Sequence, residues 1–352
     1  MSVFRKFLSM FIAICVLSCC SLHAFAVGDN LNNDQQIAIE QYTKDGHYVT
    51  KVNISAYRAD QEDVQPANIE QGSISSADME LMEILGYDEK AILNMGEDEV
   101  EDLLNNSATV TTTCSYYHYN EDTDRTEQIT KEAYLSAKAV ASARSGNNGS
   151  NSEISSDGYF KIITSAAYQY PSSVDDEKGW YVFSGTFTFW GKMPTYRMTD
   201  AASLYADEVM WSQTASDYWS RMTYYYYVDS VEDETSKTQT KTSSDRHLYS
   251  DGLYYEWKLP GDTLNGNIYV QTVTDIEIYI RGVARVSDYT NSRAFNLFTR
   301  FEHVYSTVGL QPTFSWTVGE KPGVSADVTT TKKSNTYTSL CEIDYNPSLY
   351  LV

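Results

Sequence analysis

The segment from Ile268 to Val286 alternates apolar and polar side chains with a period of two, and it constrains the fold more than any other part of the sequence. Its even-numbered positions are mainly Ile, Val and Ala, whereas its odd-numbered positions include Asp275 and Glu277. This alternation is typical of a strand with one face on a core and the other in water. Because the segment is long for a single strand, we expect a bulge near Gly282 or a break at 272–274.

The same period of two recurs after Gly158, and turn-forming pairs separate the runs. These pairs are Asp-Gly at 157–158 and 251–252 and Pro-Gly at 260–261 and 322–323. Short strands joined by such turns indicate an antiparallel β-sandwich of about 8–10 strands. Upstream, patterns for short helices at 76–85, 91–95, 100–104 and 131–141 mix with strand patterns at 109–119 and 125–129. The predicted fold class is therefore α+β, with the all-β sandwich at the C-terminal end.

Composition divides the chain into five segments. They are a signal peptide at 1–26, a loosely ordered stretch or pro-segment at 27–75, a small mixed helical and strand region at 76–144, a linker at 145–158 and the sandwich domain at 159–352. The linker is rich in Ser, Gly and Asn, which cannot bury apolar area. We therefore expect the main domain boundary there.

Residues 1–26 have the layout of a secretory signal peptide. Two basic residues, Arg5 and Lys6, precede an apolar run, and an A-x-A cleavage site follows at 24–26. We expect a secreted, extracellular protein that has no integral membrane segment after cleavage. A lipoprotein-like box that ends at Cys19 gives the alternative, a protein anchored by lipid through that cysteine.

The charge balance excludes one class of partner. The chain has 48 Asp and Glu against 26 Lys and Arg, for a net charge of −22. Such an acidic chain repels phosphate backbones, so we expect no nucleic-acid partner. Acidity also keeps an exported protein soluble.

Two cysteines, Cys114 and Cys341, remain after the predicted cleavage. An oxidising extracellular compartment favours a disulfide between two such residues, and we predict this bond. It would join the middle of the chain to its end. The alternative is a pair of buried free thiols.

The motifs of common enzymes are missing from the sequence. It contains no G-x-S-x-G elbow, H-E-x-x-H helix, P-loop or G-x-G-x-x-G loop, and we predict no cofactor and no metal site. Of the scattered histidines, His303 lies among the alternate positions of its segment that are mainly apolar. We therefore expect it to be partly buried with a hydrogen-bond partner. The sequence favours a non-enzymatic role. A hydrolase that uses a pair of carboxylates is one alternative, which predicts two facing acids with perturbed pKa values.

The chain is unusually rich in aromatic residues, and we predict that some of them lie on the surface. The chain has 29 Tyr and 6 Trp. Four of these residues are predicted to point outward and bind a partner: Tyr225, Tyr227, Tyr254 and Trp257. Outward Tyr and Trp side chains form flat contact surfaces suited to a glycan or a surface protein. The leading hypothesis is a secreted binding protein; a membrane-active or antimicrobial protein is the alternative that the amphipathic segment 268–286 suggests.

A motif at residues 190–200 forms a corner between two strands. It consists of Trp190, Pro194, Arg197 and Asp200 around Lys192, in the pattern W-x-K-x-P-x-x-R-x-x-D. We expect Pro194 to end a strand, Arg197 to pair with Asp200, and Trp190 to anchor the corner. With the leader and the strand that follows Tyr181, this motif resembles exported β-rich proteins of Gram-positive bacteria over residues 159–345. The resemblance implies a bacterial exported origin and no particular activity.

Overall fold

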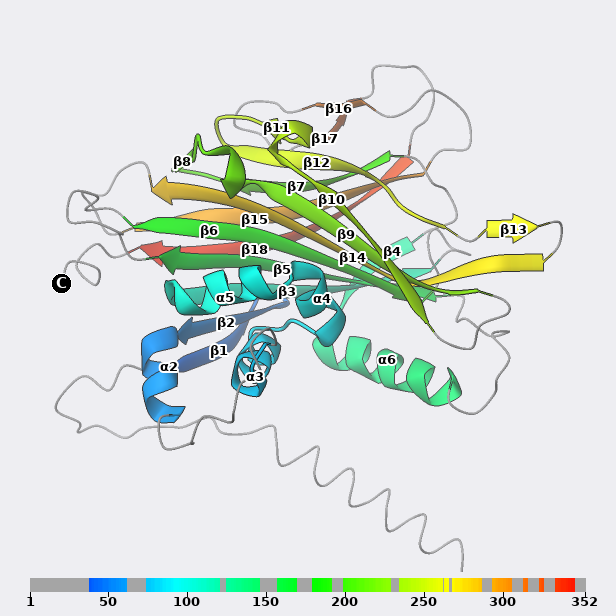
Figure 1. The fold of residues 1–352 in the computed structure, drawn as a ribbon, viewed down its shortest axis with the longest axis horizontal. Helices are drawn as coiled ribbons and strands as arrows, with labels where there is room; N and C mark the ends of the chain where they lie inside the picture. Colours follow the sequence, from blue (N-terminus) through cyan, green and yellow to red (C-terminus); the bar gives the residue numbers. More distant parts are fainter. Residues whose placement is uncertain are drawn as a thin grey trace, which may run out of the picture. The chain divides into compact units, whose positions relative to one another are not determined.

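The structure is a computed structural model, and antiparallel strands dominate it, as the sequence predicts (Figure 1). It describes residues 38–61, 74–120, 125–145, 157–169, 179–191, 199–228, 234–261, 263–265, 268–286, 293–305, 313–315, 323–325 and 333–345. The predicted signal peptide and most of the predicted linker lie outside the described residues.

The larger sheet has 11 strands, and its main path runs β1-β2-β3-β5-β6-β14-β9-β10. Their bounds are β1 (Ile39–Lys44), β2 (His47–Asn53), β3 (Ser107–Asn120), β5 (Asp157–Gln169), β6 (Trp180–Gly191), β14 (Ile268–Val286), β9 (Trp219–Val228) and β10 (Thr235–Lys241). Three further strands pair beside this path: β4 (Arg125–Ile129) with β3, and β8 (Val209–Trp211) and β13 (Thr263–Asn265) with β14.

The smaller sheet has 5 strands in the order β11-β12-β7-β15-β18. These are β11 (His247–Leu248), β12 (Gly252–Lys258), β7 (Thr199–Ala206), β15 (Arg293–Tyr305) and β18 (Lys333–Tyr345). Two short strands, β16 (Thr313–Ser315) and β17 (Gly323–Ser325), form a separate pair, and the 3-10 turns η1 (Ala215–Asp217) and η2 (Ser243–Asp245) lie between strands.

Five helices complete the described residues: α2 (Ile54–Gln61), α3 (Ser76–Ile84), α4 (Glu89–Met95), α5 (Glu97–Asn105) and α6 (Lys131–Ser145). Helices α3 to α6 confirm the helical patterns expected upstream of the linker, whereas α2 was not predicted. The Ser75 hydroxyl caps α3 by accepting a hydrogen bond from the Asp78 N–H at 3.1 Å. Each of α3, α4 and α5 has nine residues or fewer, so their stability depends on packing against the sheet.

Two buried cores lie on opposite faces of the larger sheet. In the first, residues such as Phe187 and Ile278 of the larger sheet pack with Leu297 and Phe301 of the smaller sheet. In the second, residues of the larger sheet such as Ile163 pack against helices α3 to α6. Figure 1 shows these helices below the strands, so the larger sheet is the middle layer of three.

Strand β14 keeps the predicted alternation, but its polar face is covered. Even-numbered residues such as Ile276 and Ile280 face the core between the sheets, whereas Tyr279 and Val283 belong to the core beneath the helices. Glu277, expected in water, is only 1% exposed. The prediction of a wet face is therefore wrong, because helices α4 and α5 cover that face. The register of β14 against β9 shifts between Val273 and Asp275, where a break was expected.

The predicted domain boundary at 145–158 does not separate compact units, because β3 and β5 on either side of it pair in one sheet. Residues 37–352 form a single compact unit. The stretch 27–75 also differs from the prediction where it is described. Residues 38–61 form β1, β2 and α2, and the pairing of β2 with β3 satisfies backbone groups that a loose segment would leave to water.

The predicted disulfide between Cys114 and Cys341 is wrong, because both cysteines are free and buried. Cys114 lies on the helix side of the larger sheet, with its Sγ 4.0 Å from the Leu85 carbonyl oxygen. Cys341 belongs to the core on the other side, with its Sγ 4.0 Å from the Thr111 carbonyl oxygen. The backbone of the larger sheet lies between the two thiols.

Candidate functional site

Charged side chains converge where helix α4 lies on the larger sheet. Asp88 precedes α4, and its Oδ1 accepts a hydrogen bond from the Ala91 N–H at 3.2 Å, which caps the helix. Its Oδ2 lies 3.1 Å from Lys161 Nζ on β5 and 3.2 Å from Lys138 Nζ on α6. Glu277 of β14 accepts a hydrogen bond from the Thr188 hydroxyl at 2.7 Å. We call Asp88, Lys138, Lys161 and Glu277 the α4 charge cluster.

Strand parity explains why charges are buried here. On β5, Phe160 and Ile162 face the core between the sheets, so Lys161 points the opposite way, toward the helices. The Lys161 side chain is 4% exposed. It also donates a hydrogen bond to the Gly86 carbonyl oxygen at 3.3 Å. A buried ammonium needs such partners, because burial without them costs several kcal/mol.

The cluster moves the pKa values of its two carboxyl groups in opposite directions. Burial opposes the ionisation of Asp88, but the charges of Lys161 and Lys138 outweigh it and hold the pKa of Asp88 well below its usual range. Burial raises the pKa of Glu277 well above its usual value, and the negative charge of Asp88 adds to this rise. Burial also acts to lower the pKa of Lys161, yet the two carboxyl groups raise it overall.

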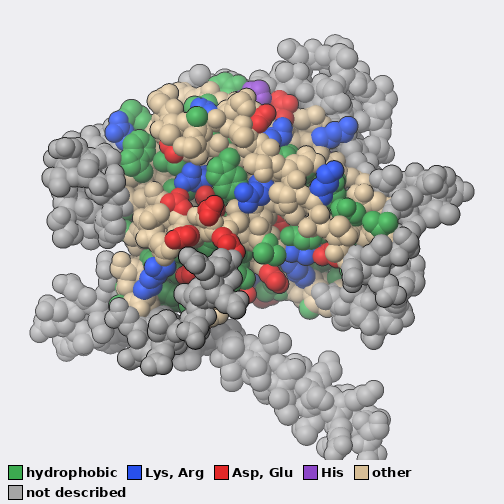
Figure 2. Space-filling view, viewed as in Figure 1, with side chains coloured by type: hydrophobic (Ala, Val, Ile, Leu, Met, Phe, Trp, Pro, Cys, Tyr) green, Lys and Arg blue, Asp and Glu red, His purple; other side chains and the backbone are tan. Residues whose placement is uncertain are grey.

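A second buried charge cluster holds helix α5. The Tyr279 hydroxyl donates a hydrogen bond to Glu99 Oε1 at 2.6 Å. Arg281 on the same strand lies 3.0 Å from Glu99 Oε1 through its Nε and 2.8 Å from Asp102 Oδ2 through a terminal nitrogen. We call these four residues the α5 charge cluster. Figure 2 shows acidic side chains gathered over this helix.

The C-terminal end of α4 is fixed by Asn94 and Arg221. Asn94 is 1% exposed; its amide donates a hydrogen bond to the Glu277 carbonyl oxygen at 3.2 Å and accepts one from the Thr223 hydroxyl at 2.7 Å. The Arg221 guanidinium donates to the carbonyl oxygens of Asn94 at 3.0 Å and Met95 at 2.8 Å. It thus satisfies carbonyl groups that a helix leaves unpaired at its C-terminus.

Two carboxyl groups with separated pKa values are the arrangement that acid–base catalysis uses. In this cluster, Asp88 and Lys161 join α4 to the sheet, and Glu277 is covered by the helix. A substrate therefore does not reach Glu277 in this conformation. The role that the cluster supports directly is attachment of helix α4 to the sheet through ionisable groups.

Two of the four aromatic residues predicted to bind a partner are buried. Trp257 is 1% exposed, belongs to the core between the sheets, and donates a hydrogen bond to Ser220 Oγ at 3.1 Å. Tyr254 is 2% exposed and stacks with the His247 ring, with centroids 4.4 Å apart. The prediction of outward contact surfaces is wrong for both residues. Trp257 is buried because it shares the face of β12 that points into the core between the sheets. Tyr254 is on the other face and is covered by His247 of β11.

The other two, Tyr225 and Tyr227, lie on the face of β9 that points away from the core between the sheets. Both are half-buried. Lys90 Nζ of α4 lies 4.2 Å from the centroid of the Tyr225 ring and forms ion pairs with Asp275 at 2.8 Å and Glu234 at 2.9 Å. Burial raises the pKa of Tyr225 to about 12, with the charge of Glu277 adding to the effect. We call Tyr225, Tyr227, Lys90, Asp275 and Glu234 the β9 rim.

The structure describes the predicted corner incompletely, because Pro194 and Arg197 lie outside the described residues. Trp190 is 5% exposed and stacks on Tyr159, with ring centroids 4.2 Å apart. Asp200 is 1% exposed, and its Oδ1 lies 3.0 Å from His303 Nδ1. His303 is 3% exposed, which confirms that it is buried with a hydrogen-bond partner.

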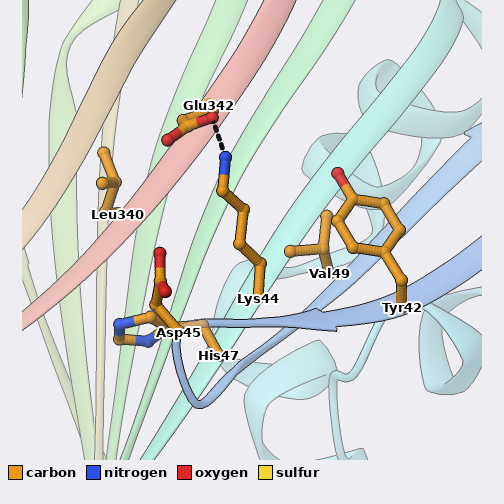
Figure 3. Close-up of a pocket in the computed structure, with 7 residues that line it drawn as sticks. All are labelled: Tyr42, Lys44, Asp45, His47, Val49, Leu340 and Glu342. Carbon is orange, nitrogen blue, oxygen red and sulfur yellow. Dashed lines mark hydrogen bonds and ion pairs between the residues drawn. The ribbon is translucent and has the colours of Figure 1, made fainter.

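A small hollow of about 30 Å³ lies between the β1–β2 hairpin and β18. Figure 3 shows Lys44 reaching across it to Glu342, with His47 and Asp45 beside them. His47 Nδ1 lies 2.6 Å from Ser115 Oγ, a spacing that also occurs in serine hydrolases. The directions of the surrounding hydrogen bonds exclude that role for this pair.

The Ser339 hydroxyl donates to the Thr113 carbonyl oxygen at 3.3 Å, since a carbonyl can only accept. Ser115 must then donate to Ser339, at 2.9 Å, and His47 must donate to Ser115. His47 therefore holds a proton on the nitrogen that a general base would need free. Burial also lowers the pKa of His47.

The sequence did not predict the two charge clusters. One sequence signal could have indicated them: ionisable residues that alternate along a strand with apolar ones. These residues are Lys161 on β5 and Glu277 and Arg281 on β14. Alternation with a period of two, taken alone, predicts that such residues are exposed to solvent. Within the described residues, no group of His, Cys, Asp and Glu has the arrangement of a metal site, and no helix is long and apolar enough to span a bilayer.

Comparisons with known proteins give no family for the chain. No family model matches it, and no curated protein matches it in sequence. Solved structures with some likeness include the Clostridium perfringens delta-toxin, at 6% identity and a TM-score of 0.22, covering 69% of this chain and 92% of that chain. The membrane-inserted form of the Clostridium perfringens NetB toxin has 9% identity and a TM-score of 0.23, covering 53% of this chain and 94% of that chain.

A third structure, titled "Pore forming protein", has 7% identity and a TM-score of 0.23, covering 51% of this chain and 86% of that chain. TM-scores this low establish neither a shared fold nor a shared function.

Proposed function

We propose that this chain is a secreted, non-enzymatic binding protein of bacterial origin that contacts a saccharide through the β9 rim. The two sheets supply a rigid β-sandwich platform, and the helices form one border of the contact surface. The observation that carries the proposal is the position of Tyr225 and Tyr227 on one face of β9, beside charged side chains that remain partly exposed.

The chemistry of the rim suits a saccharide. Tyrosine rings offer an apolar face to the C–H groups of a sugar ring. The Lys90 ammonium donates hydrogen bonds, and the Asp275 and Glu234 carboxylates accept them from hydroxyl groups. Strand β9 pairs with β10 on one side and β14 on the other, so the backbone that carries the two tyrosines is held rigidly on both sides.

Replacing Tyr227 with Ala tests the proposal. Tyrosine is enriched among the interface residues whose truncation costs most, and a loss of about 1.4 kcal/mol is tenfold in affinity, so we expect saccharide affinity to fall about tenfold. Binding of the mature protein to a glycan array, followed by titration calorimetry with the best ligand, measures this change. Tyr42→Ala on β1, where Tyr42 is 36% exposed, is the matched control and should bind normally.

Three outcomes would contradict the proposal. They are an array on which no saccharide binds, equal loss of affinity in Tyr227→Ala and Tyr42→Ala, or binding confined to surface proteins on a protein array. The last outcome would keep a binding role but replace the class of ligand.

A membrane-active protein is the second candidate, and one observation favours it. From Ile276 to Val286, strand β14 has an apolar face, and its polar face is covered by helices that ionisable groups attach. Release of the helices would expose the second face of β14, which includes Tyr279 and Val283. Leakage of a dye from phosphatidylcholine vesicles at pH 5 and pH 8 tests this candidate, and intact vesicles at both values would remove it.

A further inference from the structure

We propose that helices α3, α4 and α5 form a pH-responsive cap, which is held on the larger sheet when Asp88 is ionised and Glu277 carries a proton. We use the word cap for residues 75–105. The inference does not depend on the proposed function, because it rests on contacts of the cap with helix α6 and with strands β3, β5, β9 and β14.

The cap is attached by a few polar contacts in addition to its apolar core. Asp88 meets Lys161 of β5 at one end of α4, and Asn94 meets Thr223 of β9 at the other. Glu99 of α5 meets Arg281 of β14. Because the helices are too short to persist in water alone, weaker contacts here are expected to make the opening of the cap more frequent, with the helices moving as a group.

Ionisable groups from several elements act on Glu277. They are Asp88 of the cap, Lys161 of β5 and Asp275 of β14 itself, together with Tyr225 of β9 and Tyr134 of α6. Further groups act on these neighbours: Lys138 on Asp88, Lys90 on Asp275, and Cys114 of β3 on Lys161. Lys161 is a buried cation that acts on Glu277, and Asp88 engages it directly. One cation thus serves two carboxyl groups, which favours a proton on Glu277, the more deeply buried of the two.

The two carboxyl groups respond to pH with opposite signs. The pKa of Asp88 is lowered when the cap is closed. Its contribution to the stability of the closed cap is therefore complete above pH 3.8 and is lost as the pH falls below that value. The pKa of Glu277 is raised when the cap is closed. Its contribution to the stability of the closed cap is therefore complete below pH 4.5 and is lost as the pH rises above that value. Closure is therefore most favourable near pH 4 and weakens toward neutral pH. Burial of Glu99 raises its pKa too, which acts in the same direction as Glu277.

Hydrogen exchange of the mature protein and its Glu277→Gln variant tests the inference. Exchange of the amides of α4 and α5 is measured at pH 5 and pH 8 and corrected for the intrinsic effect of pH, with β15 and β18 as the internal reference. A difference of one pKa unit changes an opening constant tenfold. We expect wild-type cap amides to open at least tenfold more often at pH 8 than at pH 5.

Glutamine keeps the shape of Glu277 and cannot ionise, so Glu277→Gln should reduce that ratio several-fold. Glu101→Gln is the matched control, since Glu101 is an exposed residue of α5 with the same change in charge. It should keep the wild-type ratio. Equal ratios in wild type and Glu277→Gln, or cap amides that follow the reference strands at both pH values, would overturn the inference.

A second measurement needs no variant. A Cβ at Gly86 would lie 2.4 Å from Cys114 Sγ, so the cap packs tightly on this thiol, whereas Cys341 lies in the other core. The ratio of Cys114 to Cys341 labelling by a thiol reagent therefore reports cap opening, because the effect of pH on the reagent cancels. We expect the ratio to rise about tenfold from pH 5 to pH 8, and an unchanged ratio would count against the cap.

Discussion

Replacing Lys161 with Met is expected to lower the free energy of unfolding by about 3–5 kcal/mol, the usual cost of removing one partner of a buried ion pair. Methionine retains most of the apolar stem, so the loss comes from the charge. Asp88 and Glu277 would then lack the buried cation that acts on both, and α4 would lose its attachment to β5. Denaturant unfolding at pH 7, followed by circular dichroism, measures the change.

Lys138→Met is the matched control for this prediction. Lys138 contacts the same oxygen of Asp88 at 3.2 Å, but its side chain is 39% exposed. An ion pair at such a position contributes at most about 1 kcal/mol. If the two variants were equally stable, the α4 charge cluster would not hold the helix as the structure indicates.

Replacing Phe301 with Ala is expected to lower the free energy of unfolding by about 3–5 kcal/mol through a cavity between the sheets. Phe301 is 0% exposed, and its ring centroid lies 5.0 Å from that of Phe189 and 5.4 Å from that of Phe187. These rings come from β15 of the smaller sheet and β6 of the larger sheet. The variant thus measures how strongly the two sheets are joined.

Phe298→Ala on the same strand provides the control. Phe298 is half-buried on the opposite face of β15 and packs on Tyr205, with ring centroids 5.6 Å apart. We expect a loss of about 1 kcal/mol there. A loss at Phe301 no larger than that would mean that the sheets pack more loosely than the described contacts indicate.

The elements of the fold could largely be predicted from local patterns. The alternation of 268–286 marks β14, and the helix patterns near 76–85 and 131–141 match α3 and α6. The predicted boundary at 145–158 was wrong because composition describes what a segment can bury, not which strands pair across it. Strands β3 and β5 pair across that linker.

The candidate site could be predicted only incompletely. The parity of β9 placed Tyr225 and Tyr227 on one face, as the structure has them. The same reasoning could not foresee that Lys90 packs on Tyr225 or that β11 covers Tyr254. The contacts of the charge clusters also join distant segments: Lys161 and Asp88 are 73 positions apart, and Tyr279 and Glu99 are 180 apart.

The sequence by itself determined which residues alternate, where turns interrupt them and where short helices begin, because these features depend on neighbours along the chain. Only the tertiary structure decided what covers each face. It placed the helices on the polar face of β14, buried Glu277 beside Lys161, and put Cys114 and Cys341 on opposite sides of the larger sheet. The physical reason is that a period of two distinguishes the two faces of a strand, whereas the layer that meets each face is set by contacts between distant segments.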